Sequence, residues 1–255
     1  MAEEATLKAM MDAATAAARS APTDASARMK LFRLFAVTGQ WERAKTQLDT
    51  ASNLDTSLGF TAMVYKQAIA CERFRTEVFQ GRRTPVIAGE PPQWLALMVE
   101  ALRADSGGSA GGASLRAQAL ESARASAGRL DGTAFEWVAD ADSRLGPVCE
   151  CFIDGKYYWV PFERIARLGL SEPDDVLEMV WASAEITFSG GGEKHALIPV
   201  RYPGSESSDD DAIRLARKTV WEGSDEQGWR GLGQRVWATD EAEVAMLDVR
   251  QIELG

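Results

Sequence analysis

The chain has 255 residues, enough for one large domain or two modest ones, and its 45% apolar share is that of a folded globular protein rather than a disordered one. The net charge of −10 is uneven: residues 1–130 hold 16 Lys and Arg against 13 Asp and Glu, and residues 131–255 hold 12 against 25. The strongly acidic second half should repel the phosphate backbone of nucleic acids, so a nucleic acid is disfavoured as a partner.

The termini and cysteines indicate a cytoplasmic protein. Glu3 and Glu4 stand where a secretory signal has Lys or Arg, and no stretch approaches 18 uncharged apolar residues. Cys71, Cys149 and Cys151 are odd in number and follow no disulfide framework. We therefore expect a soluble protein of a reducing compartment, with no membrane partner.

The most informative pattern in the first half is a repeat of 34 residues, the period of a tetratricopeptide. Shifted by this period, Met10 falls on Ala44 and Ala14 on Leu48. In the second copy, small and bulky residues recur every three or four positions, as closely packed helices require: Trp41, Ala44, Leu48, Ala51 and Leu54. An ordinary helical bundle with the same spacing is the alternative.

More helices are predicted before residue 130. One spans roughly 57–80, carries Phe60 on its apolar face, and ends at Gly81. Pro92 opens the next, whose apolar face begins at Trp94. The Gly/Ser tract 107–112 is predicted to be a surface loop before a last helix at about 114–126. Residues 1–128 thus predict a helical, tetratricopeptide-like domain.

The second half has the patterns of strands. Asp154-Gly155 lies between two apolar runs, which is a strong hairpin signal. Short helices are predicted from Pro161 and Pro173, and the acids 209–211 are expected to cap a helix at 212–217. Further strands are predicted at 184–188, 195–200, 218–222, 233–238 and 245–253. The predicted fold is therefore α+β, with residues 129–255 forming an acidic, antiparallel β-rich domain, either a partly open sheet or a small barrel.

The sequence offers little catalytic chemistry. His195 is the only histidine and lies in a predicted strand without a nearby Ser or Cys nucleophile. Cys149 and Cys151 lack a second pair of ligands, and their spacing puts both thiols on one face of a strand, which favours a core position over zinc. No phosphate-binding loop is present. We therefore expect no catalytic residue, metal or cofactor.

Asp140 and Asp142, followed by Arg144, form the most suggestive acidic cluster. Two carboxylates two residues apart could hold Mg²⁺ or act as an acid and base pair on a small ligand. Alternatively, such carboxylates bind backbone amides within a loop, with the arginine pairing one of them. Both interpretations stay open.

Aromatic side chains indicate protein binding. The chain has 8 tryptophans, several in polar surroundings, and tryptophan commonly anchors protein interfaces. Helical hairpins that carry aromatic residues suit a groove for a partner helix. The hypothesis is a concave surface within residues 28–80, extended by Trp94, with contacts through Phe35, Trp41 and Tyr65.

Several segments resemble, in the same order along the chain, those of the ImpE family, also called TagJ or SciE. They are GEPPQWLA at 89–96, the segment 131–147, YYWVPFE at 157–163 and PVRYPGSE at 199–206. The Gly/Ser tract and the weak first repeat depart from the family pattern. These motifs add Tyr158, Arg201 and Tyr202 to the candidate cluster around Asp140.

The resemblance implies a cytoplasmic, non-enzymatic accessory protein of bacterial type VI secretion, with a tetratricopeptide-like domain before a mixed domain. It also implies binding to an N-terminal helix of the small sheath subunit, and so a link to sheath assembly or to recycling by the ClpV ATPase. The alternatives are a scaffold or effector adaptor with other protein partners, and an enzyme that uses Asp140, Asp142 and Arg144. The oligomeric state stays open.

Overall fold

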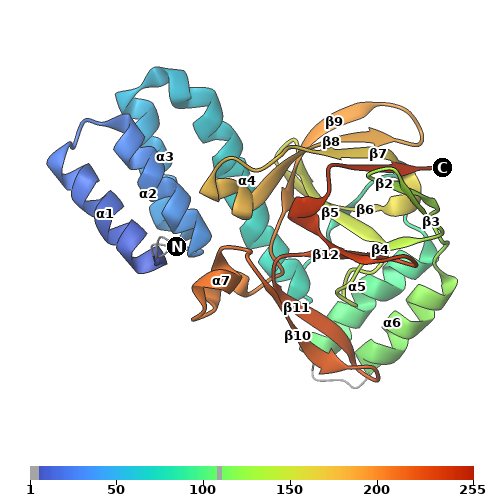
Figure 1. Ribbon diagram of the computed structural model, residues 1–255. Coiled ribbons are helices and arrows are strands. Elements are labelled where there is room, and N and C mark those ends of the chain that lie inside the picture. The colour runs from blue at the N-terminus through green and yellow to red at the C-terminus, as the bar shows by residue number, and fades with distance from the viewer. Residues whose placement is uncertain (1–5, 108–110) are drawn as a thin grey trace.

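The computed structural model describes residues 6–107 and 111–255 (Figure 1). Glu3 and Glu4 and the centre of the Gly/Ser tract lie outside these ranges. Helices α1, α2 and α3 stand to one side of a large sheet, and α4 runs from them to the sheet. No helix in the described ranges is long and apolar enough to cross a membrane.

The 34-residue repeat forms two helical hairpins. The first consists of α1 (Leu7–Ser20) and α2 (Ala25–Val37), and the second of α3 (Trp41–Leu54) and α4 (Gly59–Phe79). α1 and α3 begin 34 residues apart, and so do α2 and α4. The small-residue stripe lies in the interface, because Ala44, Leu48 and Ala51 are fully buried. The predicted tetratricopeptide-like arrangement is therefore confirmed.

Local signals fix the ends of these helices. The side chains of Thr6 and Asp24 accept hydrogen bonds from the first backbone N–H groups of α1 and α2. Gly39 ends α2 with a φ of 64°, and the N–H of Gln40 donates to the carbonyl of Phe35 at 2.8 Å. This is a Schellman cap, which needs the left-handed backbone that glycine adopts at little cost. The turn into α3 is thereby set by sequence.

A third hairpin follows after a short strand. β1 (Val86–Ile87) leads to α5 (Gln93–Ser106) and α6 (Gly111–Ser122), which pack closely together. Pro92 precedes the first residue of α5, as predicted. α6 begins and ends three or four residues earlier than the sequence indicated.

The main sheet has the order β1-β6-β5-β9-β8-β7-β14-β2-β3, which leaves two free edges. β1 pairs with β6 in parallel, and the other pairings in the described ranges are antiparallel. Besides β1, the strands of this sheet are β2 (Gly128–Leu130), β3 (Thr133–Phe135), β5 (Val148–Ile153), β6 (Lys156–Pro161), β7 (Ile165–Leu170), β8 (Trp181–Phe188), β9 (Glu193–Pro199) and β14 (Gln251–Leu254). The predicted α+β fold with a partly open antiparallel sheet is confirmed.

Two smaller sheets complete the second half. One has the order β13-β12-β4 and the other is the hairpin β10-β11. Their bounds are β4 (Val138–Asp140), β10 (Thr219–Ser224), β11 (Gly228–Gly233), β12 (Val236–Thr239) and β13 (Glu243–Ala245). The strand predicted at 245–253 is thus divided between β13 and β14, with a single helical turn at Met246–Asp248 between them.

The hairpin at Asp154-Gly155 is confirmed. It joins β5 to β6, and both turn residues have positive φ values of 49° and 72°. A two-residue turn of this kind matches the right-handed twist of the flanking strands.

The helix predicted from Pro161 is wrong. Only Phe162–Arg164 forms a helical turn, and Ile165 begins strand β7. A β-bulge between Ile165 and Arg167 shifts the register, so that Ile165 and Leu168 both point into the core. Their spacing of three residues therefore imitates a helix.

Two other short helices are shorter than predicted. The segment after Pro173 forms one turn, Val176–Met179, with a capping box between Asp175 and Glu178. α7 (Asp211–Arg214) covers the beginning of the helix predicted at 212–217. The acidic run caps it as expected, because the Asp210 carboxylate accepts a hydrogen bond from the N–H of Ala212.

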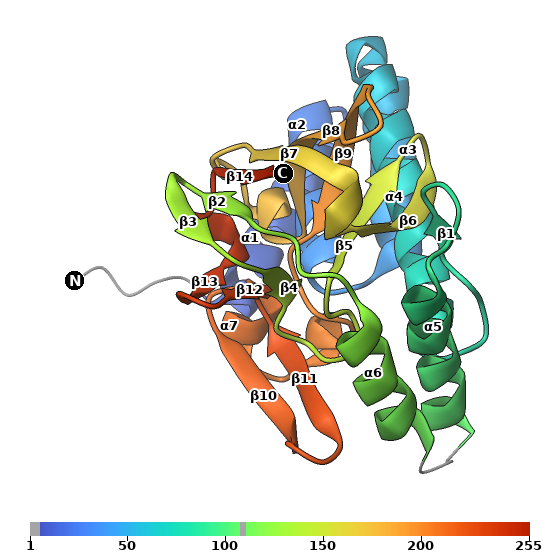
Figure 2. The same ribbon diagram turned by 90° about the vertical axis from the view of Figure 1, so that its right-hand side faces the viewer.

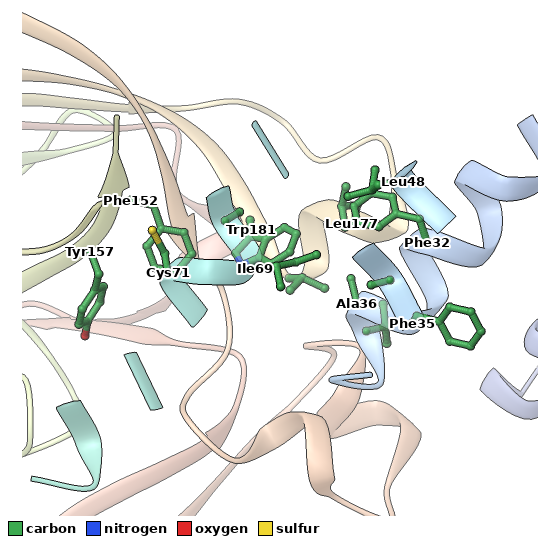
Figure 3. Packing of buried hydrophobic residues seen from close by; sticks show 14 of the residues in the cluster. Phe32, Phe35, Ala36, Leu48, Ile69, Cys71, Phe152, Tyr157, Leu177 and Trp181 are labelled. Carbon is green, nitrogen blue, oxygen red and sulfur yellow. The ribbon is translucent and has the colours of Figure 1, made fainter. Parts of the chain in front are cut away.

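Two hydrophobic clusters lie on opposite faces of the main sheet. One joins the helices to Tyr157, Trp159 and Trp181, and Figure 3 shows its side chains reaching from α2 and α3 to the sheet. The other includes Cys149 and Val160 and is covered by the last strands of the chain. The division of the chain at residues 128 and 129 stays a prediction.

Candidate functional site

A buried network of charges joins α4 to both the main sheet and the β13-β12-β4 sheet. Its centre is Glu150 on β5, which is fully buried. Arg75 of α4 donates to Glu150 through Nε and through Nη2, the latter at 3.0 Å. Arg235, which precedes β12, donates to Glu150 at 2.9 Å and to Asp140 of β4 at 2.7 and 2.9 Å. These bonds connect three separate elements inside the core.

Asp140 and Asp142 lie side by side in this network. Asp140 accepts hydrogen bonds from the Tyr202 hydroxyl at 3.0 Å and from the N–H of Asp142 at 2.9 Å. Asp142 accepts from the N–H of Gly231 at 2.9 Å and pairs with Arg144 at 2.5 Å. Each carboxylate oxygen therefore has a donor from the protein. These are the contacts of the loop-amide interpretation, and any further role for the cluster stays a prediction.

Arg201 and Tyr158 lie apart from these carboxylates. The Arg201 guanidinium donates to the carbonyls of Val37 and Arg214, both at 2.6 Å, and so closes the C-terminal end of α2. Burial lowers the pKa of Arg201 to about 10. Tyr158 packs with the second hydrophobic cluster, on the sheet face opposite to Tyr157.

The network has unequal charges. The carboxylates are Glu72, Asp140, Asp142 and Glu150, and the guanidinium groups are Arg75, Arg144 and Arg235. Although burial opposes it, Arg75 and then Arg235 hold the pKa of Glu150 below its usual value. Burial raises the pKa of Asp140 to about 6, against the attraction of Arg235. Asp140 is therefore the weaker acid of the two that share Arg235.

The aromatic residues predicted to contact a partner make contacts within the chain. Trp41 and Tyr65 stack on Trp181, with ring centroids 6.0 and 5.9 Å apart, and the Trp181 indole N–H donates to Glu72 at 2.9 Å. Figure 3 shows Trp181 reaching into the helical layer. These contacts dock the repeat hairpins on β8.

Phe35 and Trp94 are both almost fully buried. The Arg43 guanidinium lies 4.1 Å from the centroid of the Phe35 ring and covers it. Partner binding through Phe35, Trp41, Tyr65 and Trp94 stays a prediction.

The most exposed apolar side chains of the helical half lie at the tip of the α3–α4 hairpin. Phe60 is 74% exposed and Met63 is 47% exposed. The sequence placed Phe60 on the buried face of its helix, and that expectation is wrong. In the first turns of α4 only Ala62 is buried, so this end overhangs the layer that covers the later turns with Ala68 and Cys71. Because this overhang depends on where α3 ends, α4's own pattern does not reveal it.

A groove of about 440 Å³ lies between α3 and α4, and its lining includes Met63 and Gly59, the neighbour of Phe60 in sequence. Charged side chains pair across it: Arg73 with Glu42 at 2.5 Å, and Lys66 with Asp49. Its lining residues are Glu42, Lys45, Gly59, Met63, Lys66, Gln67, Ile69, Ala70 and Arg73. The groove thus has an apolar floor and a rim that carries both signs of charge.

Comparison with known proteins identifies the family. The model of the family described as ImpE protein matches residues 132–253. A protein of Pseudomonas aeruginosa, the type VI secretion system accessory component TagJ, is 44% identical over 238 residues, which are 92% of this chain and 83% of that protein. This chain belongs to the ImpE family.

A solved structure agrees with the fold of this ImpE-family chain. The crystal structure of a protein from Vibrio parahaemolyticus matches with a TM-score of 0.88 at 26% identity, over 98% of this chain and 94% of that one. The helical half and the sheet half are therefore both present in that relative.

The ImpE family segment contains most of the buried network. Asp140, Glu150 and Arg235 lie within the matched residues, whereas Arg75 lies on α4, outside them. Four charged residues of the network were not predicted from the sequence: Glu72, Arg75, Glu150 and Arg235. A charged residue within an apolar helix or strand pattern is a sign of a buried charge, and these residues show it. Their partners could not be predicted, because they are distant in sequence.

Proposed function

We propose that this ImpE-family chain is a non-enzymatic, cytoplasmic accessory component of a type VI secretion system that binds a helix of a partner protein. The similarity to the accessory component TagJ supports the system. The α3–α4 groove, with Phe60 and Met63 exposed beside it, is the observation that carries the binding mode. The proposed occupant is the N-terminal helix of the small sheath subunit, and a ClpV-type ATPase is engaged indirectly.

The groove has the physical properties that an amphipathic helix needs. Such a helix presents apolar side chains at intervals of three or four residues, and Phe60 and Met63 lie one turn apart on α4. Burying these two side chains removes apolar surface from water, and the flexible methionine adapts to different partner shapes. The mixed charges of the rim, such as Lys45 and Glu42, give orientation.

The carboxylates of Asp140 and Asp142 support a non-enzymatic function. Both are buried, and protein donors occupy their oxygens. Catalysis at this position would require these bonds to break before a substrate or metal could bind. No observation at this cluster favours the enzyme alternative over protein binding.

Isothermal calorimetry with a synthetic peptide of the sheath subunit's N-terminal helix tests the proposal. We expect saturable binding in roughly the micromolar range. The double variant Phe60→Ala/Met63→Ala should weaken binding at least tenfold, because exposed apolar anchors carry most of the energy of such contacts. The matched control is Val220→Ala, which removes an exposed apolar side chain from β10 instead.

The two possible failures are distinguishable. An absence of saturable binding by the unaltered chain excludes this partner. Equal binding by the unaltered chain and the Phe60→Ala/Met63→Ala variant keeps the partner but excludes the groove. Co-purification of other proteins in place of the sheath subunit would favour a scaffold or effector adaptor.

A further inference from the structure

A second exposed aromatic surface lies on the β10–β11 hairpin. Trp221 of β10 and Trp229 of β11 line a cleft of about 350 Å³, together with Glu243 of β13 and Ala141. Trp229 is 41% exposed. Figures 1 and 2 both place this hairpin at the end of the molecule away from the α3–α4 tip. The cleft is therefore separate from the groove between α3 and α4.

The register of the hairpin puts both indoles on one face. Trp221 pairs with Gly231, and Trp229 pairs with Gly223. Residues two apart on a strand share a face, so the two tryptophans lie diagonally on the same face, each opposite a glycine. The Tyr202 ring lies over Gly231, in the place of a side chain opposite Trp221. No cross-strand side chain lies opposite Trp229, because Gly223 stands there.

Contacts with the rest of the chain hold the two indoles in place. The Trp229 indole N–H donates to Asp225 at 3.0 Å, and the Trp229 backbone N–H donates to the Ser143 hydroxyl oxygen at 2.9 Å. The Trp221 ring packs against the buried Tyr202 ring, with centroids 5.6 Å apart. A cleft whose walls are already ordered loses little conformational entropy when a ligand binds.

The charge of the cleft is negative. Within the described ranges, Glu243 makes no ion pair and no side-chain hydrogen bond, so its carboxylate is free to attract a cation. Arg230, the arginine of the hairpin, is directed to Asp105 at 3.3 Å. Two indole faces and a carboxylate are the groups that bind a cationic side chain, through cation–π attraction and direct charge pairing.

A second, mainly apolar groove of about 380 Å³ shares the lining residue Ala141 with the cleft, and its lining also includes the cation Arg124. Its walls include Leu120 and Trp137, which are 42% and 38% exposed. The surface is therefore longer than a single small cation requires. It suits a stretch of polypeptide with a cationic side chain next to apolar ones.

We propose that this surface binds a basic, apolar segment of a partner protein. A Lys or Arg side chain enters the cleft between Trp221 and Trp229 with its charge toward Glu243. Neighbouring apolar side chains lie in the groove over Leu120 and Trp137. The acidic charge of this half of the chain disfavours anionic ligands and anionic lipid surfaces. The proposal does not depend on the function of the α3–α4 groove, and both surfaces can be occupied at once.

The test is an NMR titration that follows the tryptophan indole N–H signals of the full chain. The probe is a ten-residue peptide of alternating arginine and leucine. The control peptide has citrulline in place of arginine, which keeps the shape and hydrogen-bonding groups but removes the charge. Trp221→Phe and Trp229→Phe assign the two signals.

We expect the signals of Trp221 and Trp229 to shift and saturate with the arginine peptide. The citrulline peptide should bind at least tenfold more weakly, and Glu243→Gln should weaken the arginine peptide about threefold to tenfold. Leu120→Ser should also weaken binding of the arginine peptide. Phe60→Ala, at the tip of the α3–α4 hairpin, should leave that binding unchanged. Circular dichroism checks that each variant is folded.

Three results would overturn the proposal. The first is that the signals of Trp221 and Trp229 do not shift, whether or not other indole signals do. The second is equal binding of the arginine and citrulline peptides. The third is equal affinity for the peptide and for N-acetylarginine amide, which would exclude a role for the apolar groove.

Discussion

Asp140 shares one arginine with a stronger acid, and burial, against the attraction of that arginine, raises the pKa of Asp140. Arg235 donates to both Asp140 and Glu150, and Glu150 has Arg75 as a second partner. Burial keeps the pKa of Asp140 near 6, while the arginines lower that of Glu150. The two carboxyl groups therefore contribute to stability with opposite dependence on pH.

The stability of the chain relative to an Asp140→Asn variant should fall as pH rises from about 4 to 7. Unfolded Asp140 ionises near its ordinary value of 3.8, whereas the folded group stays protonated up to about 6. Unfolding within this window releases a proton, so the free energy of unfolding decreases with pH, by about 3 kcal/mol in total.

Urea unfolding of both proteins across this pH range measures the effect. The Glu150 contribution is fully present above its ordinary pKa of 4.5 and is lost only on acidification, so the comparison is read from about pH 5 upward, where Glu150 is ionised in both proteins. A difference between the two proteins that does not change with pH would contradict the assignment.

Arg75 and Arg73 on α4 form a matched pair of arginines. Arg75→Met removes two hydrogen bonds and one ion pair from the buried Glu150 and should lower the free energy of unfolding by about 3–5 kcal/mol. Arg73 is 64% exposed and pairs with Glu42 at the surface, so Arg73→Met should change the free energy of unfolding by less than about 1 kcal/mol. Denaturant unfolding compares them, and equal effects would show that the buried network does not stabilise the chain.

At the scale of elements, a helix, strand or turn could be predicted from sequence where its cause lies in neighbouring residues. The repeat hairpins were predictable because helix packing places small and bulky residues such as Ala44 and Leu48 at fixed intervals. The turn at Asp154-Gly155 was predictable because its backbone suits these residues. β7 was missed because its bulge depends on the register with β8. The network around Glu150 was missed because it joins residues from three distant elements.

Gly39 and Gly59 should respond oppositely to alanine. Gly39 has a positive φ, and a Cβ there would lie 2.5 Å from the Glu206 Cγ atom, so Gly39→Ala should destabilise the chain by about 1 kcal/mol or more. Gly59 has helical angles and open space, so Gly59→Ala should be neutral or stabilise by up to about 1 kcal/mol. Thermal unfolding gives the sign of each, and destabilisation by both would contradict this view of the α2–α3 turn.

At the scale of the whole molecule, the helical layer and the sheet share one core. Trp181 of β8 lies between Trp41 and Tyr65, and Arg75 reaches Glu150 across the same interface. The tip of the α3–α4 hairpin and the β10–β11 hairpin extend from this core at separate ends (Figure 2). The fold thus holds two exposed apolar surfaces in a fixed relation.

The shared core should make unfolding cooperative. We expect one transition in urea, with the same midpoint by tryptophan fluorescence and by far-ultraviolet circular dichroism. Residues 1–128 expressed alone should not fold stably, because they expose the helical surface that Trp181 and Trp159 cover in the whole chain. Two separate transitions, or a stably folded fragment, would show that the halves are independent.

The most direct test of partner binding compares the small sheath subunit with a version that lacks its N-terminal helix. Binding of each to this chain is measured at equal concentration by calorimetry. We predict saturable binding of the intact subunit and at least a hundredfold loss when the helix is removed. Equal binding of the two forms, or no binding of the intact subunit, would contradict the proposed function.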